Sequence, residues 1–461
     1  MIVPHPWQED ALAAFDSLDG LFLGQPPGSG KTWVIAQCLS RGQRPLLACP
    51  AAARTQTRKM FDSYGVRSGF VSYSQISRDP DLLERYKPDV IGLDEGHALR
   101  RTRDSAWGRR ISRYLAANPS CRVVASTGSA MHRDMADYAH LLDWALRSRS
   151  PAPRSQAGIE RAAREAAANP EAWLATLRAC PGVYIDAAPS WDGELVIREH
   201  VLPVSDDSAY ARAAATGLAP DGWACEGFAL DELLRQLSWG YYIGRSPRPS
   251  PELVDLRRTW AKCVAEAKAY GLCDTEMGAR EHYPAAWAAY SAAFTAEKCE
   301  PVTVWVGPPG TEHVHWGGVP VKAGTIVWVN HPVLAERVTK LCAWPYHHEK
   351  GLDERGVSLD QTTAPVVVAS IKACHASFNA QGNFCHNIVL EPPSDARVWQ
   401  QLICRTARQG QKSPCVSVDV VVSSPTAAAD LATARKLAAE IERQTGQAQA
   451  LLTPTQKEKQ T

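Results

Sequence analysis

Hydrophobic and polar positions follow two patterns that alternate over the first third of the chain. Short apolar runs, each bounded by Gly, Pro, Ser or Asp, are separated by segments whose apolar residues recur with helical spacing. These runs occur at 21–23, 46–49, 70–73, 90–93 and 123–126. Strands that alternate with amphipathic helices in this way are typical of a parallel sheet with helices on both faces.

The pattern changes after a polar, proline-containing segment at 147–158, which is followed by a helical pattern at 159–180. Further strands are predicted at 194–205, 326–329, 366–369, 388–390 and 416–422. We therefore expect an α/β fold with a second α/β unit in the later half. The expected divisions are 1–190; 191–425, with a mostly helical insertion at 206–300 and a hairpin around Pro-Pro-Gly at 303–316; and a C-terminal helix with a polar tail at 426–461.

Composition is that of an ordinary globular protein, because 45% of the 461 residues are apolar and the formal net charge is +1. This balance gives no global field that would favour nucleic acid, so any basic surface has to be local. The N-terminus lacks the basic and apolar regions of a signal peptide, and no apolar run approaches the ~20 residues of a membrane span. We expect a cytoplasmic protein with no membrane partner.

The 13 cysteines are scattered and form no Cys-x-x-Cys pair. Several lie inside apolar runs, which favours buried, reduced thiols, with disulfides or a zinc site as the alternatives. Cys374-His375 and Cys385-His386 offer metal-binding side chains, but their spacing matches no structural zinc pattern.

The string LFLGQPPGSGKTWVIAQ near the N-terminus places a glycine-rich turn between an apolar strand and a helix, the context of a phosphate-binding loop. Gly28 and Gly30 allow backbone N–H groups to face phosphates. Lys31 is expected to reach the β- and γ-phosphates of ATP, and the Thr32 hydroxyl to bind Mg²⁺. Gln25 replaces the first glycine of the usual motif, but it lies at the mouth of the loop, so we expect binding to survive.

An acidic element follows the apolar run at 90–93. In VIGLDEGH, Asp94 and Glu95 emerge where that predicted strand ends. A carboxylate pair at the end of a strand, in a chain with a phosphate-binding loop, suits Mg²⁺ binding by Asp94 and activation of water by Glu95. The two elements together predict a site for ATP hydrolysis.

These residues resemble the motifs of superfamily 2 helicases, and within them those of Swi/Snf-type double-stranded DNA translocases in a compact phage or bacterial form. The matching strings, in chain order, are HPWQ (5–8), QPPGSGKT (25–32), LLACPAAARTQTRKMF (46–61), VSYSQI (71–76), DEGH (94–97), STGSAMHRDMADYAHLLDW (126–144), LLRQL (233–237), IVWVNHPVLAERV (326–338), ASIKACHASFNAQ (369–381) and QLICRTARQGQ (401–411). The last matches Q-x-x-x-R-x-x-R-x-G-Q at every fixed position. Ser129 and Ala130 replace a Thr-Pro pair of relatives, and Cys374, His375 and Ser377 replace glycines.

The resemblance implies two RecA-like lobes in tandem that share one ATP and Mg²⁺ site. Gln8 would recognise adenine, and Gln401 would contact the γ-phosphate or the attacking water. Arg405 and Arg408 would stabilise charge on the γ-phosphate from the second lobe. The family's form of the phosphate loop does not require a glycine at position 25. The expected nucleotide-binding residues are Gln8, Gln25, Gly28, Ser29, Gly30, Lys31 and Thr32, the metal ligands Thr32 and Asp94, and the catalytic residues Lys31, Asp94, Glu95, Gln401, Arg405 and Arg408.

A locally basic stretch at 97–113 offers a candidate DNA contact. Its arginines are Arg100, Arg101, Arg103, Arg109, Arg110 and Arg113. Such density could track the phosphates of DNA, and a solvated amphipathic helix is the alternative.

We expect a monomeric, DNA-dependent ATPase that moves along double-stranded DNA, in the cytoplasm of a bacterium or of a phage-infected host. One alternative is a strand-separating or branch-migrating helicase of superfamily 2. Another is a nucleotide-dependent DNA-binding scaffold with weak hydrolysis, which the replaced glycines at 374–377 suggest.

Overall fold

The computed structural model describes residues 4–453 apart from 52, 97–104, 129–133, 186–190, 192, 204–207, 221–227, 248, 274–275, 299, 307–318 and 375–377; at 228, 229, 245, 258, 261, 265, 268, 276 and 350 it describes the backbone alone. The chain forms two compact units. Unit 1 comprises 1–192, 268–275 and 436–452, and unit 2 comprises 193–267, 276–435 and 453–461.

The centre of unit 1 is a six-stranded sheet with strand order β3-β2-β4-β5-β1-β6, in which all pairs are parallel. Its strands are β1 (Gly20–Leu23), β2 (Pro45–Cys49), β3 (Gly69–Ser72), β4 (Val90–Leu93), β5 (Arg122–Ser126) and β6 (Val183–Tyr184). The five apolar runs of the sequence account for β1 to β5, because a strand covered on both faces is apolar throughout. The two-residue β6 was not predicted.

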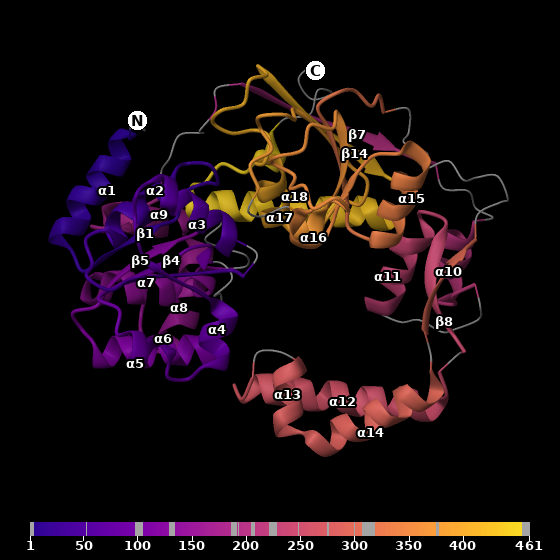
Figure 1. The fold of residues 1–461 in the computed structure, drawn as a ribbon, viewed down its shortest axis with the longest axis horizontal. Helices are drawn as coiled ribbons and strands as arrows, with labels where there is room; N and C mark the ends of the chain where they lie inside the picture. The colour runs from indigo at the N-terminus through magenta and orange to yellow at the C-terminus, as the bar shows by residue number, and fades with distance from the viewer. Residues whose placement is uncertain are drawn as a thin grey trace. The chain divides into compact units, whose positions relative to one another are not determined.

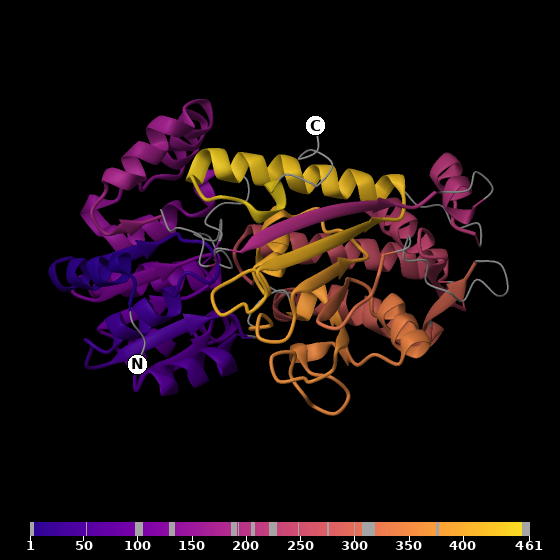
Figure 2. The same cartoon turned by 90° about the horizontal axis from the view of Figure 1, so that it is seen from above.

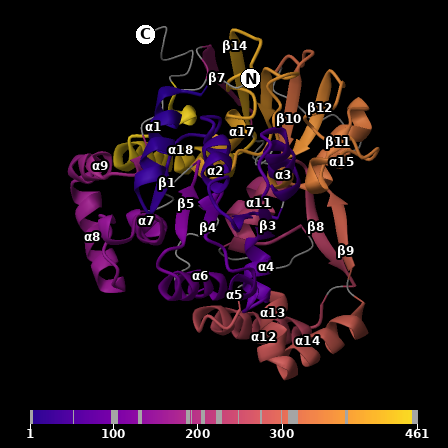
Figure 3. The same ribbon diagram turned by 60° about the vertical axis from the view of Figure 1, so that its left-hand side comes forward.

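Helices cover both faces of this sheet (Figure 3). They are α1 (Pro6–Ser17), α2 (Lys31–Leu39), α3 (Arg54–Ser63), α4 (Tyr73–Arg78), α5 (Leu82–Tyr86), α6 (Ala106–Ala117), α7 (Ala139–Leu146), α8 (Gln156–Ala168) and α9 (Pro170–Ala179). The chain winds from β1 toward β3 through α2 and α3, then back through α4 to α7. Because crossovers between parallel strands are right-handed, the two directions place helices on opposite faces.

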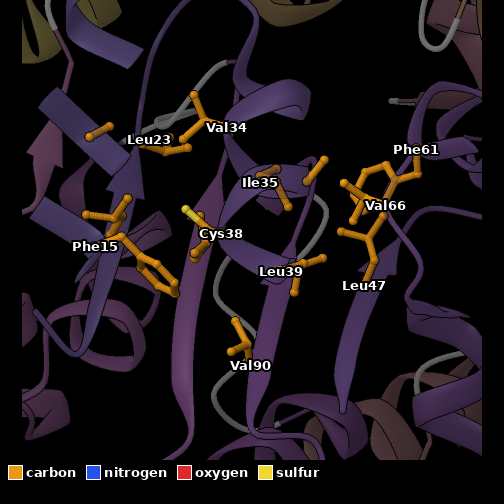
Figure 4. Packing of buried hydrophobic residues seen from close by; sticks show 14 residues of the cluster. Phe15, Leu23, Val34, Ile35, Cys38, Leu39, Leu47, Phe61, Val66 and Val90 are labelled. Atoms are coloured by element: carbon orange, nitrogen blue, oxygen red, sulfur yellow. The ribbon is translucent and has the colours of Figure 1, made fainter. Parts of the chain in front are cut away.

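The core beneath α1, α2 and α3 fixes the position of α2. Figure 4 shows Ile35, Cys38 and Leu39 of α2 among side chains from β1, β2, β4 and the flanking helices. These α2 side chains are completely buried. Burial raises the pKa of the Cys38 thiol to about 12, so it is a neutral part of the core.

Unit 2 has a second parallel sheet, with strand order β11-β12-β10-β13-β14-β7. Its strands are β7 (Glu194–Val201), β10 (Thr325–Val329), β11 (Tyr346–His347), β12 (Val366–Ser370), β13 (His386–Val389) and β14 (Cys415–Val422). Figure 2 shows β7 (magenta) alongside β14 (gold) over its full length. The predicted fold class, α/β with two RecA-like lobes in tandem, is confirmed by the two helix-flanked parallel sheets.

The helices of unit 2 include the C-terminal helix that the sequence predicts. They are α10 (Ala209–Thr216), α11 (Phe228–Leu237), α12 (Pro251–Ala269), α13 (Glu276–His282), α14 (Pro284–Glu297), α15 (Pro332–Cys342), α16 (Ile371–Cys374), α17 (Ala396–Ile403) and α18 (Pro425–Thr445). Residues of α18 from 436 onward group with unit 1. The polar tail from 454 lies outside the described residues.

The insertion at 206–300 contains a strand as well as helices. Strand β8 (Tyr241–Ser246) pairs in antiparallel register with β9 (Glu300–Trp305), and α12 to α14 lie at the far end of this ribbon (Figure 1). Trp260 and Trp287 pack at 5.2 Å between ring centres inside the helical part. The predicted hairpin at 303–316 stays a prediction, because residues 307–316 lie outside the described part of the chain.

Candidate nucleotide site

The glycine-rich loop connects β1 to α2 and leaves the start of that helix without a side-chain cap. Gly28 and Gly30 both adopt φ +87°, a left-handed conformation that favours glycine. A Cβ atom on Gly30 would lie 2.3 Å from Nε2 of Gln8, so a larger residue would have to displace the Gln8 amide from the loop. A helix N-terminus that begins with a bare glycine is the backbone arrangement that binds phosphate.

Lys31 lies in this loop with its ammonium group buried. Its Nζ donates hydrogen bonds to the carbonyl oxygens of Gln25 and Pro26, both at 2.7 Å. Thr32, the next residue of α2, is half-buried. Two buried side-chain oxygens of the loop, Oε1 of Gln25 and Oγ of Ser29, have no hydrogen-bond partner among the described residues. Unpaired polar atoms are costly to bury, so this loop is chemically incomplete without a polar ligand.

Gln8 contacts the loop directly. Its Oε1 accepts the N–H of His5 at 2.8 Å, and its Nε2 donates to the carbonyl oxygen of Ser29 at 3.3 Å. The amide group thus joins the start of α1 to the phosphate loop. Recognition of adenine by Gln8 remains a prediction.

The acidic pair directly follows β4. The N–H of Asp94 donates to Ala48 at 2.9 Å, which continues the sheet, and its Oδ1 accepts the hydroxyl of Ser126 at 2.7 Å. Burial and the neighbouring carboxylate of Glu95 raise the pKa of Asp94 to about 6, while the charge of Lys31 acts in the opposite direction. A buried carboxylate held between an ammonium and a second carboxylate is a typical setting for a divalent cation.

The order of the strands explains why these groups meet. Strand β5 lies between β1 and β4, so the loop after β1 and the acidic pair after β4 share one edge of the sheet, and Ser126 ends the strand between them. Ligands of parallel α/β sheets bind at this carboxyl edge. The glycines, the unpaired hydroxyl of Ser29 and the buried Lys31 and Asp94 therefore fit a nucleoside triphosphate with its Mg²⁺.

The remaining predicted residues belong to unit 2. Gln401 is buried in α17. The buried guanidinium of Arg405 donates to the backbone oxygens of Gln401 at 3.1 Å and Phe378 at 2.8 Å. Arg408 is half-buried and donates to Oδ1 of Asn379 at 2.8 Å. Both arginines hold the segment that follows residues 375–377.

Sequence reasoning missed two residues that hold the acidic pair, Ser126 and Tyr73. The Tyr73 hydroxyl donates to the carbonyl oxygen of Asp94 at 2.6 Å. Both residues stand at the carboxyl ends of strands, β5 and β3, and that position was the available signal.

The basic stretch at 97–113 is described only from residue 105 onward. In α6, Arg113 pairs with Glu84 at 2.9 Å and Arg110 donates to the carbonyl of Ile76. These two arginines thus hold α4 and α5 in place. Arg100, Arg101 and Arg103 lie outside the described residues, so phosphate tracking remains a prediction.

Metal binding by the cysteine–histidine pairs finds no support within the described part of the chain, which holds no cluster of three metal-binding side chains. Burial raises the pKa of Cys374 to about 12, and His375 is not described. His386 lies between the hydroxyl of Thr325 (2.9 Å) and a carboxylate oxygen of Asp419 (2.7 Å), so its ring holds three strands of unit 2 together.

A second pocket, of about 320 Å³, lies within unit 2 at the carboxyl edge of its sheet. Several of the charged groups that line it pair with one another. His331 contacts Glu232 at 2.7 Å and also Glu391, and Arg235 contacts Asp430 at 2.8 Å. Burial disfavours the charge on His331, but the hydrogen bonds that its ring donates to both carboxylates outweigh this effect and raise its pKa to about 9. This pocket is a structural ion-pair network.

Comparison with known proteins gives matches among solved structures alone. No protein-family model and no curated protein matches the chain. Among solved structures it is similar to the Mycobacterium smegmatis helicase Lhr bound to ssDNA and AMP-PNP, with 11% identity and a TM-score of 0.48 over 95% of this chain. The chain spans about half of that helicase, 48% of its length. Within the described residues, every helix is too short or too polar to cross a membrane.

Proposed function

We propose that the chain is a DNA-dependent ATPase, a motor that hydrolyses ATP and moves along double-stranded DNA. The observation that carries the proposal is the meeting of Lys31, Asp94 and Glu95 at one edge of the unit 1 sheet, beside a glycine-rich loop whose buried Ser29 hydroxyl has no partner among the described residues. This arrangement supports binding of a triphosphate and hydrolysis of its terminal bond.

The residues of unit 1 have distinct tasks in this proposal. The backbone of the glycine-rich loop binds phosphate oxygens, and Lys31 exchanges its two carbonyl acceptors for oxygens of the β- and γ-phosphates. Glu95 orients the attacking water and accepts its proton. Thr32 and Asp94 hold the Mg²⁺, which supplies neutralisation of phosphate charge.

Gln401, Arg405 and Arg408 are proposed to act on the same nucleotide from unit 2. Arg408, which is half-buried and donates to Asn379, is proposed to contact the γ-phosphate. Arg405 is buried against two backbone oxygens, so its first task is to position the segment at Phe378.

The deciding experiment compares stimulation of ATP hydrolysis by duplex and single-stranded DNA, alongside triplex displacement and unwinding of forked duplexes. We expect stronger stimulation by duplex and displacement of the triplex strand. Single-strand stimulation with unwinding would favour the strand-separating alternative. ATP binding without DNA-stimulated turnover would favour the scaffold.

A further inference from the structure

Tyr73 connects a distant part of the unit 1 edge to the acidic pair. It is the first residue of α4 and directly follows β3, which is separated from β4 by β2. Its hydroxyl reaches across the end of β2 and donates to the carbonyl oxygen of Asp94 at 2.6 Å. The side chain is buried, and the ring packs against Trp107 with 6.1 Å between ring centres.

The start of α4 is itself rigidly held. Ser72 accepts the N–H of Gln75 at 3.2 Å, and the Gln75 side chain accepts the N–H of Ser72 at 2.8 Å. This reciprocal pair is a capping box, which fixes the first turn of a helix. Gln75 also accepts a hydrogen bond from Arg54 of α3 at 3.1 Å. The hydroxyl of Tyr73 is therefore presented from a fixed support.

The hydrogen bond falls on an unusual peptide group. Glu95 has φ +52°, in the left-handed region that residues with a Cβ rarely adopt. The peptide joining Asp94 to Glu95 is held on both sides, because its carbonyl accepts from Tyr73 and its N–H donates to Oδ1 of Asp94 at 3.0 Å. The orientation of this peptide plane determines the direction in which the Glu95 side chain leaves the backbone.

Burial also keeps the hydroxyl in its donor form. It raises the pKa of Tyr73 well above its ordinary value, and the nearby carboxylates of Asp94 and Glu95 act in the same direction.

We propose that Tyr73 is a positioning residue for hydrolysis: its hydroxyl locks the Asp94–Glu95 peptide so that Glu95 is aimed at the attacking water. This inference rests on the proposed ATPase function. Removal of the hydroxyl should leave nucleotide binding intact, since Tyr73 contacts the acidic pair and not the phosphate loop. It should slow the chemical step, because a small misplacement of a catalytic group is expensive.

Tyr73→Phe tests this, and Tyr114→Phe is a matched control. The buried Tyr114 donates its hydroxyl to the carbonyl of Pro88 at 2.8 Å, just before β4 begins, whereas Tyr73 donates just after β4 ends. We expect Tyr73→Phe to lower kcat by about tenfold to a hundredfold with KM and nucleotide Kd within about twofold of the wild type. Tyr114→Phe should change none of the three by more than about twofold.

Gln75→Ala provides a second variant, since it loosens the support at the protein surface and keeps the hydroxyl. It should lower kcat in the same direction by a smaller factor at unchanged KM. A normal kcat in Tyr73→Phe overturns the inference, as does a loss of nucleotide affinity equal to the loss of kcat. If wild-type protein turns over no ATP, the proposed function fails and the inference with it; normal wild-type turnover with a normal Tyr73→Phe removes the inference alone.

Discussion

The two units have the same kind of sheet edge, but they differ in how the helices that follow the strands begin. The start of α2 in unit 1 lacks the side-chain oxygens that accept backbone N–H groups near the starts of α15, α17 and α18 in unit 2. In unit 2, the Oε2 atom of Glu391 accepts the N–H groups of Asn330 (2.7 Å) and His331 (2.9 Å) just before α15. Asp395 caps α17 and Ser424 caps α18 through their own oxygens. In unit 1, α2 begins at Gly30, and no side chain caps it.

This difference shows where an external anion is needed. A helix start carries partial positive charge and N–H groups that lack an acceptor within the helix. Unit 2 satisfies these groups with its own oxygens, so its edge is complete as folded. Unit 1 presents a glycine and a buried ammonium instead, and a bound phosphate would complete it.

The largest effect is expected when the ammonium group of Lys31 is removed from unit 1. Lys31→Ala should reduce ATP turnover by about a hundredfold to a thousandfold, because the charge on the β- and γ-phosphates loses its partner. Lys340→Ala, at an exposed position of α15, is the control and should leave turnover unchanged. Steady-state ATP hydrolysis measures the turnover of both variants. Turnover near the wild-type level in Lys31→Ala would show that Lys31 has no part in hydrolysis.

Replacement of the glycine at the start of α2 should have the next largest effect, a loss of nucleotide affinity. Gly30→Ala places a Cβ 2.3 Å from Nε2 of Gln8 at φ +87°, and we expect nucleotide affinity to fall by at least about tenfold. Gly65→Ala shares the positive φ (+69°) but has no atom within 4 Å of its Cβ. It should cost about 1 kcal/mol of folding stability and no affinity. Equal nucleotide affinities of the two variants in titrations would contradict binding of phosphate at the start of α2.

The folding stability of unit 2 should depend on pH through His331. Because its pKa in the folded state, about 9, exceeds the ordinary value of about 6.5, His331 stabilises unit 2 fully below pH 6.5 and loses this contribution as pH rises through 9. The loss should be roughly 2 kcal/mol, since Glu232 is partly exposed.

Hydrogen exchange of β10 and α15 peptides at about pH 6 and about pH 10, after correction for the intrinsic rates, measures this loss. Glu232→Gln should flatten the pH dependence, whereas Glu336→Gln, at an exposed site on α15, should preserve it. A wild-type protein without this pH dependence would show that His331 is not the charged centre of the network.

The smallest expected effect comes from a single cap of unit 2. Ser424→Ala removes the oxygen that accepts the N–H of Ala427 at 3.2 Å and should destabilise unit 2 by about 1 kcal/mol in denaturant unfolding. Ser394→Ala, at an exposed neighbouring position, is expected to be neutral. Turnover should be unchanged in both variants, and a turnover defect in Ser424→Ala would mean that this cap takes part in function.

Local features of the sequence were enough to predict most strands and the composition of the unit 1 edge. Buried parallel strands are apolar runs, and the phosphate loop and acidic pair each occupy a few consecutive residues. These signals need no knowledge of distant partners. They led to Lys31, Asp94 and Glu95, which the structure brings to one edge.

Contacts between distant segments were not predictable in the same way. Strand β9 pairs with β8 across the whole helical part of the insertion, and nothing in its local pattern names that partner. The hydrogen bond from Tyr73 to Asp94 depends on the order of the strands in the sheet. The hydrogen bond from Arg405 to Phe378 likewise joins residues that lie far apart in the sequence. A spacing pattern indicates which residue types are present, but only the tertiary fold determines which backbone oxygens they reach.

The docking of Lys31 on two carbonyl oxygens has a thermodynamic consequence. Its ammonium is already removed from bulk water before any ligand arrives. Phosphate entry would exchange one pair of oxygen acceptors for another, without a new dehydration of the cation and with little ordering of the side chain. Binding should therefore show a small heat-capacity change and a modest entropy cost in calorimetry, the signature of a preorganised loop.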